Sequence, residues 1–129
     1  MGAVRELRVA LTVEDFDAAL HFYRDVLGLD EQEAWSEQGR VVILEAGRAT
    51  LELLDTAHAA VVDGIETGRR RPTPIRLALE VADSAATAEA LEAAGAERLG
   101  GPVVTPWSHR NVRLRAPEGT QLTLFSVLQ

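Results

Sequence analysis

Apolar and polar residues alternate with a period of two in two short segments, residues 7–13 and residues 75–81. This alternation predicts two strands, each with one face packed against other side chains and one more polar face. The segments lie 68 residues apart, from Arg8 to Arg76, and Arg, Ala, Leu, Val and Asp recur at equivalent places in both. The chain is therefore predicted to contain two copies of one structural unit.

A helix is predicted after each of these strands. Asp15 and Asp83 stand where an N-cap residue belongs, because a carboxylate there accepts hydrogen bonds from the open amides of the first turn. The first helix continues with apolar residues at helical spacing until Gly28, and the second is alanine-rich and covers roughly residues 84–94. Tyr23 belongs to the apolar stripe of the first helix, so it is predicted to lie in the core.

Three further strands are predicted after each helix. Between the copies, residues 56–73 show little periodicity and contain Gly68 and Pro72, so they are predicted to form a linker with the arginines of 69–71 in solvent. The further strands are expected near residues 31–37, 40–46 and 49–54 in the first copy, and near 96–99 (resuming at 103–107), 111–115 and 120–127 in the second.

Strand, helix and three strands, twice over, predict an α+β fold of two tandem βαβββ modules. The chain of 129 residues has the size of a single domain. We place module 1 at about residues 5–55, the linker at about 56–73 and module 2 at about 74–128 of one domain over residues 1–129.

Two motifs resemble those of the vicinal oxygen chelate superfamily, which includes glyoxalases, extradiol dioxygenases and bleomycin-resistance binding proteins. They are Phe22 to Leu29 (FYRDVLGL) and Arg113 to Leu124 (RLRAPEGTQLTL), the latter resembling the closing hairpin of the family. The resemblance covers nearly the whole chain. It implies mixed sheets that curl into a cup with the helices outside, and a homodimer.

In the metalloenzymes of that superfamily, four strands each carry one metal ligand. The resemblance places Arg8, Glu52, Arg76 and Thr123 at these positions, where the family uses His or Gln at the first and third and Glu at the second and fourth. Only Glu52 fits this pattern, because arginine stays protonated and has no lone pair to offer a cation. No metal ion and no other cofactor is therefore predicted.

The alternation places Arg8, Arg76, Glu52 and Glu80 on the cup face. Charges on a sheltered face need partners, because an isolated buried ion costs several kcal/mol or more. Two interpretations stay open. In one, Arg8–Glu52 and Arg76–Glu80, or the crossed pairs, neutralise each other and the cup is structural. In the other, an arginine keeps donors for a carboxylate, phosphate or enolate of a ligand.

Three further residues are candidates for ligand binding near the cup. Trp107 lies in a polar loop, where its ring could stack on a planar or cationic ligand, close the end of the barrel or contact a second chain. Trp35 lies on a predicted edge strand and suits an interface or a ligand. His109 follows Trp107 and is either a proton carrier or a solvated turn residue.

The composition excludes several classes of function. The net charge of −7 opposes nucleic-acid binding, and the absence of cysteine excludes disulfides, thiolate metal sites and cysteine nucleophiles. No apolar run approaches the roughly 20 residues that a membrane span requires, and the N-terminus does not have the pattern of a secretory signal. We therefore expect a cytoplasmic protein without membrane or nucleic-acid partners.

The resulting hypothesis is a metal-free protein that sequesters a small molecule in a cup lined by Arg8, Arg76 and Glu52. The alternative is a lyase or isomerase of the same superfamily, in which Arg8 or Arg76 stabilises an oxyanion and Glu52 moves a proton. The sequence leaves open whether the chain is an enzyme, and it assigns no catalytic residue other than Glu52 under that alternative. A third hypothesis is a structural or regulatory domain whose cup is filled.

Overall fold

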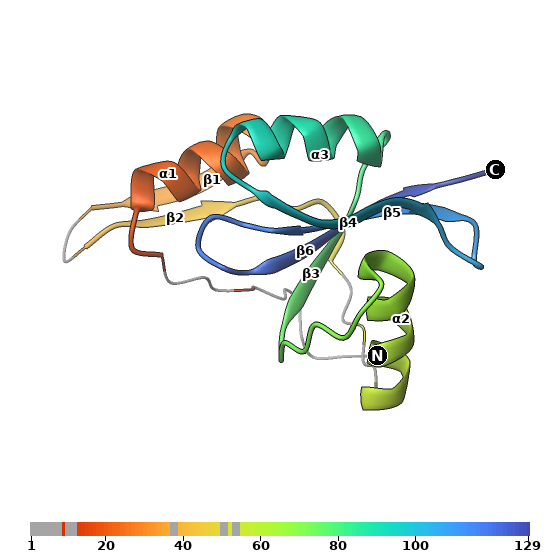
Figure 1. Cartoon of the computed structure of the whole chain (residues 1–129). Helices are drawn as coiled ribbons and strands as arrows, with labels where there is room; N and C mark the ends of the chain where they lie inside the picture. Colours follow the sequence, from red (N-terminus) through yellow and green to blue (C-terminus); the bar gives the residue numbers. More distant parts are fainter. Residues whose placement is uncertain (1–8, 10–12, 37–38, 50–51, 53–54) are drawn as a thin grey trace, which may run out of the picture. The chain divides into compact units, whose positions relative to one another are not determined.

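The computed structural model describes residues 9, 13–36, 39–49, 52 and 55–129 (Figure 1). The chain divides into two compact units, Met1–Leu53 and Leu54–Gln129, and each is described here by itself. The predicted strands at residues 7–13 and 49–54 fall largely outside the described residues. The predicted first module is therefore visible only in part.

The described part of the first unit contains a helix and a two-stranded antiparallel sheet. Asp15 caps the helix as predicted, since its side chain accepts from the Ala18 amide at 3.0 Å. The last part of the helix is π-helical rather than α-helical. Phe22 and Tyr23 are buried, which confirms the core prediction for Tyr23. The elements are α1 (Phe16–Leu20), η1 (His21–Val26), β1 (Glu31–Trp35) and β2 (Val41–Leu44).

The second unit contains the predicted strand, helix and three strands. They are β3 (Arg76–Glu80), α3 (Ser84–Ala93), β4 (Glu97–Val104), β5 (His109–Arg115) and β6 (Gln121–Val127). The order in the sheet is β3-β6-β5-β4, with β3 and β6 parallel and the other pairs antiparallel. β4 is one strand with two register shifts, where the sequence predicts a short strand that stops and resumes.

One face of this sheet is apolar and packs on α3. Ala88 and Leu91 of the helix are fully buried, and so are the alternate leucines of β5 and β6, Leu114, Leu122 and Leu124. The period of two that predicts the strands thus also selects the side chains of the core. The opposite face, called the polar face below, carries Arg76, Asn111, Arg113, Gln121 and Thr123.

The linker prediction for residues 56–73 is wrong, because these residues begin with a helix, α2 (Thr56–Thr67). Asp55 caps it by accepting from the His58 amide at 2.8 Å, and Gly68 ends it in the left-handed conformation at φ +80°. α2 belongs to the second unit and contacts β4 and β5, so that α3 and α2 lie on opposite faces of the sheet (Figure 1). Among the described residues, no helix has the length and apolar character that a membrane crossing requires.

Candidate functional site

Helix α2 covers part of the polar face and is attached to it mainly by charged side chains. Its buried residues are Val62, Asp63 and Glu66, which lie on one side of the helix. Glu66 is 2% exposed and Asp63 is 6% exposed. Carboxylates this deeply buried require charge partners and hydrogen-bond donors.

The carboxylate of Glu66 accepts three hydrogen bonds from the sheet. Arg113 donates from Nε and Thr123 donates from its hydroxyl, both to Oε1 at 2.8 Å. Asn111 donates from its amide to Oε2 at 2.8 Å. These three residues come from two neighbouring strands, β5 and β6, so the sheet itself fixes the donors around one carboxylate.

Arg113 is the centre of this arrangement and is fully buried. Its Nη1 donates to Oε1 of Gln121 at 2.8 Å and lies 3.1 Å from Oδ1 of Asp63. Its Nη2 is buried and has no hydrogen-bond partner among the described residues, and the same holds for Oδ1 of Asn111. We call the set the Arg113 cluster; it consists of Asp63, Glu66, Asn111, Arg113, Gln121 and Thr123.

Asp63 connects the cluster to the arginine-rich segment that follows α2. It accepts from Nη1 of Arg70 at 2.9 Å and from the Arg71 amide at 3.0 Å. Burial raises the pKa of Asp63, but the hydrogen bonds from Arg71, Arg113 and Arg70 outweigh it and leave that pKa below its ordinary value. The sequence predicts residues 69–71 as a solvated linker; the Arg70 side chain is 43% exposed, but Arg70 and the Arg71 backbone also make specific contacts with Asp63 that the sequence does not indicate.

The predicted metal positions in the second unit do not suit a cation. Arg76 donates from Nη1 to the Thr123 hydroxyl at 2.8 Å, and that hydroxyl in turn donates to Glu66. A guanidinium offers no lone pair, and the lone pairs of the threonine oxygen face a positive donor. Within residues 9, 13–36, 39–49, 52 and 55–129, no group of three or more His, Cys, Asp or Glu side chains is arranged to hold a metal ion.

The two other members of the predicted metal set belong to the first unit, and their place beside Arg76 and Thr123 stays a prediction. Glu52 is exposed and belongs to the first unit, and Arg8 lies outside the described residues. The suggested Arg76–Glu80 ion pair does not form in the part of the chain that is described. Four residues along a strand separate two Cα atoms by about 13 Å, which is too far for this pair.

The structure places the aromatic candidates on different elements. Trp107 is 42% exposed in the turn between β4 and β5. His109 is the first residue of β5 rather than a turn residue, and its ring stacks on Phe125 with centroids 5.0 Å apart. Trp35 is the last residue of β1, in the first unit. Glu80 is exposed on β3, next to Phe125 in the sheet register.

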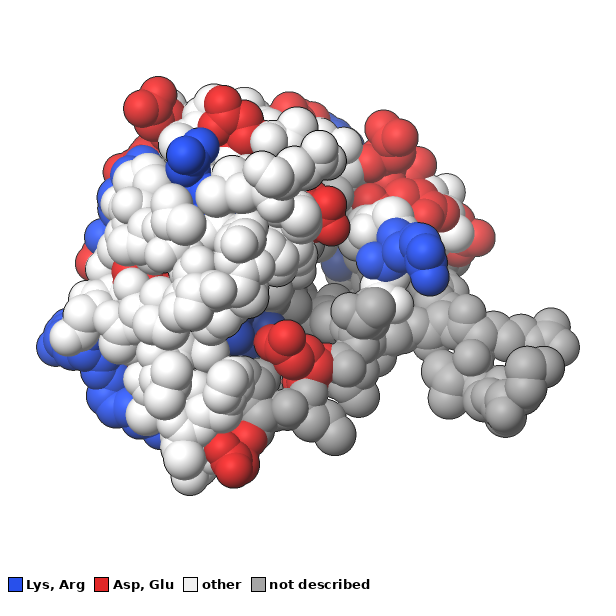
Figure 2. All heavy atoms as spheres, turned by 90° about the vertical axis from the view of Figure 1, so that its right-hand side faces the viewer, with Lys and Arg blue, Asp and Glu red and all other residues white. Residues whose placement is uncertain are grey.

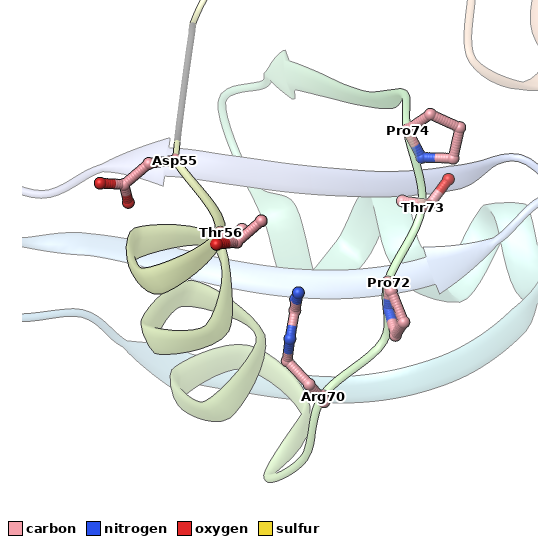
Figure 3. A pocket seen from close by; sticks show the side chains of 7 residues that line it. Asp55, Thr56, Arg70, Pro72, Thr73 and Pro74 are labelled. Carbon is pink, nitrogen blue, oxygen red and sulfur yellow. The ribbon is translucent and has the colours of Figure 1, made fainter.

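A hollow of about 360 Å³ lies between the first turns of α2 and the segment that leads to β3. Figure 3 shows Arg70 reaching into the space between them. Arg70 also donates to Asp63, so the hollow adjoins the Arg113 cluster. Its lining consists of Asp55, Thr56, Ala59, Arg70, Pro72, Thr73 and Pro74.

Sequence reasoning missed most of the Arg113 cluster. Arg113 and Asn111 lie on the polar side of a predicted strand, so the alternation of that strand could have placed both on the polar face. Asp63 and Glu66 gave no comparable signal, because charged residues at helical spacing normally indicate a solvated helix face.

The family model of the Glyoxalase/Bleomycin resistance protein/Dioxygenase superfamily matches residues 7–124. Hypothetical protein SA1046 from S. aureus is similar in structure, with a TM-score of 0.66, 17% identity, and coverage of 97% of this chain and 95% of that one. TnmS3, an antibiotic binding protein from Streptomyces sp. CB03234, has a TM-score of 0.63 and 22% identity, with 98% and 99% covered. A superfamily member from Sphaerobacter thermophilus has a TM-score of 0.62 and 22% identity, with 95% and 98% covered. No curated protein matches the sequence.

Proposed function

Because the chain belongs to the glyoxalase/bleomycin resistance protein/dioxygenase superfamily, we propose that it binds a small organic molecule without a metal ion. The ligand lies on the polar face of the second unit's sheet. Arg76 contributes to this site, and the predicted contributions of Arg8 and Glu52 from the first module are part of the same proposal. The function is sequestration, with no chemical step.

The hydrogen bond between Arg76 and Thr123 carries the proposal. At two positions where the metalloenzymes of the family need His or Gln and Glu, this chain has a guanidinium donating to a hydroxyl at 2.8 Å. A divalent cation placed there would meet a positive charge and a weak neutral ligand. The guanidinium of Arg76 suits an organic ligand better, because a guanidinium donates hydrogen bonds to anionic or carbonyl oxygens.

The end of the polar face near the β4–β5 turn carries aromatic side chains that support binding of a flat ligand. Phe125 and His109 stack on each other there, and Glu80 stands exposed beside Phe125. Aromatic faces next to a carboxylate are suited to planar ligands, especially cationic ones. TnmS3 is described as an antibiotic binding protein. We extend that chemical class, a small organic compound, to this chain as part of the proposal.

We further propose that the protein is a cytoplasmic homodimer. Val104, Trp107 and Val127 are all exposed near the end of the sheet that holds the β4–β5 turn. The side of the molecule seen in Figure 2, which is the right-hand side of Figure 1, has a broad central area without Lys, Arg, Asp or Glu. Exposed apolar side chains such as these three favour association between chains. Light scattering coupled to gel filtration measures the mass in solution.

A lyase or isomerase remains the alternative, with Glu52 as the proton-transferring group and Arg8 or Arg76 as the oxyanion-stabilising group. The two functions differ in how Glu52→Gln behaves. In an enzyme, this change abolishes turnover and leaves ligand affinity nearly intact. In a sequestering protein, it changes affinity only.

The first experiment is a calorimetric titration of chelator-treated protein with Ni²⁺, Zn²⁺, Mn²⁺ and Fe²⁺. We expect no stoichiometric site, and a site of micromolar or tighter affinity would overturn the metal-free proposal. The same protein is then titrated with bleomycin, an antibiotic that carries a planar bithiazole group and a cationic tail, while tryptophan fluorescence is recorded. Saturable quenching that Trp107→Phe reduces and Glu80→Gln weakens supports the site. Saturable quenching unaffected by Glu80→Gln contradicts the placement on this face.

A further inference from the structure

We propose that the donors of β5 and β6 form a binding site for the carboxylate group of a small molecule, and that Glu66 of α2 occupies this site in the present structure. The inference rests on the proposed function, since it names the chemical group by which a ligand binds the polar face. Under this proposal, α2 is an internal competitor of the ligand.

The donors fit a carboxylate closely. Nε of Arg113, the hydroxyl of Thr123 and the amide of Asn111 reach the two oxygens of one carboxylate, each at 2.8 Å. All three side chains are buried, with exposures of 0%, 2% and 4% respectively. Charge-assisted hydrogen bonds in a dry site are the strong ones, and strands hold such donors more firmly than loops. The strands of the sheet therefore preorganise these three donors for a carboxylate.

The site also has hydrogen-bonding capacity that Glu66 does not use. Nη2 of Arg113 and Oδ1 of Asn111 are buried and have no partner among the residues that the structure describes. Buried polar atoms in native proteins are nearly always satisfied, so an unused donor and acceptor in one cluster need an explanation. A ligand with polar groups beside its carboxylate would supply the missing partners.

The attachment of α2 is suited to exchange. Two of its three buried residues are carboxylates, Asp63 and Glu66, and only Val62 is apolar. The helix is therefore attached largely by hydrogen bonds and ion pairs of its carboxylates, and a dissolved anion can form the same bonds with the sheet. A dissolved anion cannot replace an apolar contact. An intramolecular carboxylate acts at an effective concentration on the order of millimolar. A ligand must exceed this through contacts beyond its carboxylate.

The hollow beside α2 provides room for those contacts. Its volume of about 360 Å³ is within the range of small-molecule sites. Ala59 lines the hollow, and Asp63 and Glu66 follow it along the same side of the helix. The hollow keeps its α2 wall when only the Glu66 side chain leaves the donors, because Ala59 lies in the first turns of α2 and Glu66 near its end.

The test uses acetate as the probe and the full chain with Glu66→Ala, which empties the site. We expect acetate to raise the thermal unfolding temperature of this variant in a saturable manner, with sodium chloride of equal ionic strength producing no such rise. Glu66→Ala combined with Arg113→Met is the matched control and should not respond to acetate. Equal unfolding temperatures of the single variant in acetate and chloride would overturn the proposal.

A second measurement keeps the test decisive if Glu66→Ala does not fold. In the wild-type protein, hydrogen exchange of the α2 amides should become faster with increasing acetate and unchanged with chloride, because acetate displaces Glu66. Exchange that is identical in both salts up to molar concentrations refutes the competition. A tight metal site in the calorimetric titration would overturn the proposed function without affecting acetate binding. Loss of the acetate effect alone overturns only the present inference.

Discussion

Replacing Arg113 by methionine tests whether the charge cluster holds α2 on the sheet. Methionine keeps much of the length of arginine but removes its charge and all its donors. Glu66 and Asp63 then lose their central partner while their side chains are only 1% and 8% exposed. Removing one partner of a buried ion pair leaves an uncompensated charge and costs about 3–5 kcal/mol. A small domain has a total stability of about 5–15 kcal/mol, so the loss would be a large fraction of it.

Urea unfolding followed by tryptophan fluorescence and circular dichroism measures this change. For small proteins the free energy of unfolding falls by about 1–3 kcal/mol per molar urea. A loss of about 4 kcal/mol therefore lowers the unfolding midpoint by about 2 M. Arg115→Met is the matched control, because Arg115 lies two residues further along β5 and pairs with Glu97 at 3.0 Å in solvent. An exposed pair contributes only about 0–1 kcal/mol.

The comparison of the two variants decides the question. If Arg113→Met lowers the midpoint no more than Arg115→Met, the buried cluster does not hold α2 and the reasoning fails. Adding Glu66→Leu to Arg113→Met removes one of the two orphaned carboxylates. This double variant should recover part of the lost stability, since a buried ion pair is often replaced by apolar residues without penalty.

Three further changes test separate parts of the same arrangement. The pKa of Asp63 is lowered, so its contribution to stability is complete above its unfolded pKa of about 4 and is lost as the pH falls through the folded value. Asp63→Asn should therefore make the plot of stability against pH shallower below about pH 4. An unchanged plot would speak against the Arg70 and Arg113 contacts. In Gly100→Ala the new Cβ would lie 2.0 Å from the carbonyl oxygen of Glu66, so thermal unfolding should occur at a clearly lower temperature, with a loss of about 1–3 kcal/mol. Gly64→Ala is its counterpart within α2, where a Cβ meets nothing within 4 Å, and it should stabilise the protein by about 0.5–1 kcal/mol; a destabilised Gly64→Ala would contradict the position of α2.

The second module could be predicted from the sequence because its signals are local and agree with one another. The alternation at residues 75–81, the N-cap at Asp83 and the turn before Gly119 each indicate an element without reference to the rest of the chain. The structure confirms β3, α3 and the cap, in which Asp83 accepts from the Ala86 amide at 3.0 Å. The leucines of β6 lie under α3, as the period of two requires.

The role of α2 could not be predicted in the same way, for a physical reason. Hydrophobic periodicity detects a helix only when its buried side is apolar. In α2 that side consists largely of Asp63 and Glu66, so the pattern resembles a solvated linker. Its N-cap at Asp55 and its stop at Gly68 were visible in the sequence. These two signals indicate a packed helix only when Arg113 of β5 is known to face Asp63 and Glu66.

The two faces of the sheet are thus stabilised by different interactions, apolar packing on the α3 side and buried charges on the α2 side. On the α3 side, leucines and alanines pack through contacts that no dissolved ion can imitate. On the α2 side, one arginine and two carboxylates form buried ion pairs, and a carboxylate from outside has the same chemistry as Glu66. What occupies the polar face depends on which carboxylate Arg113 binds.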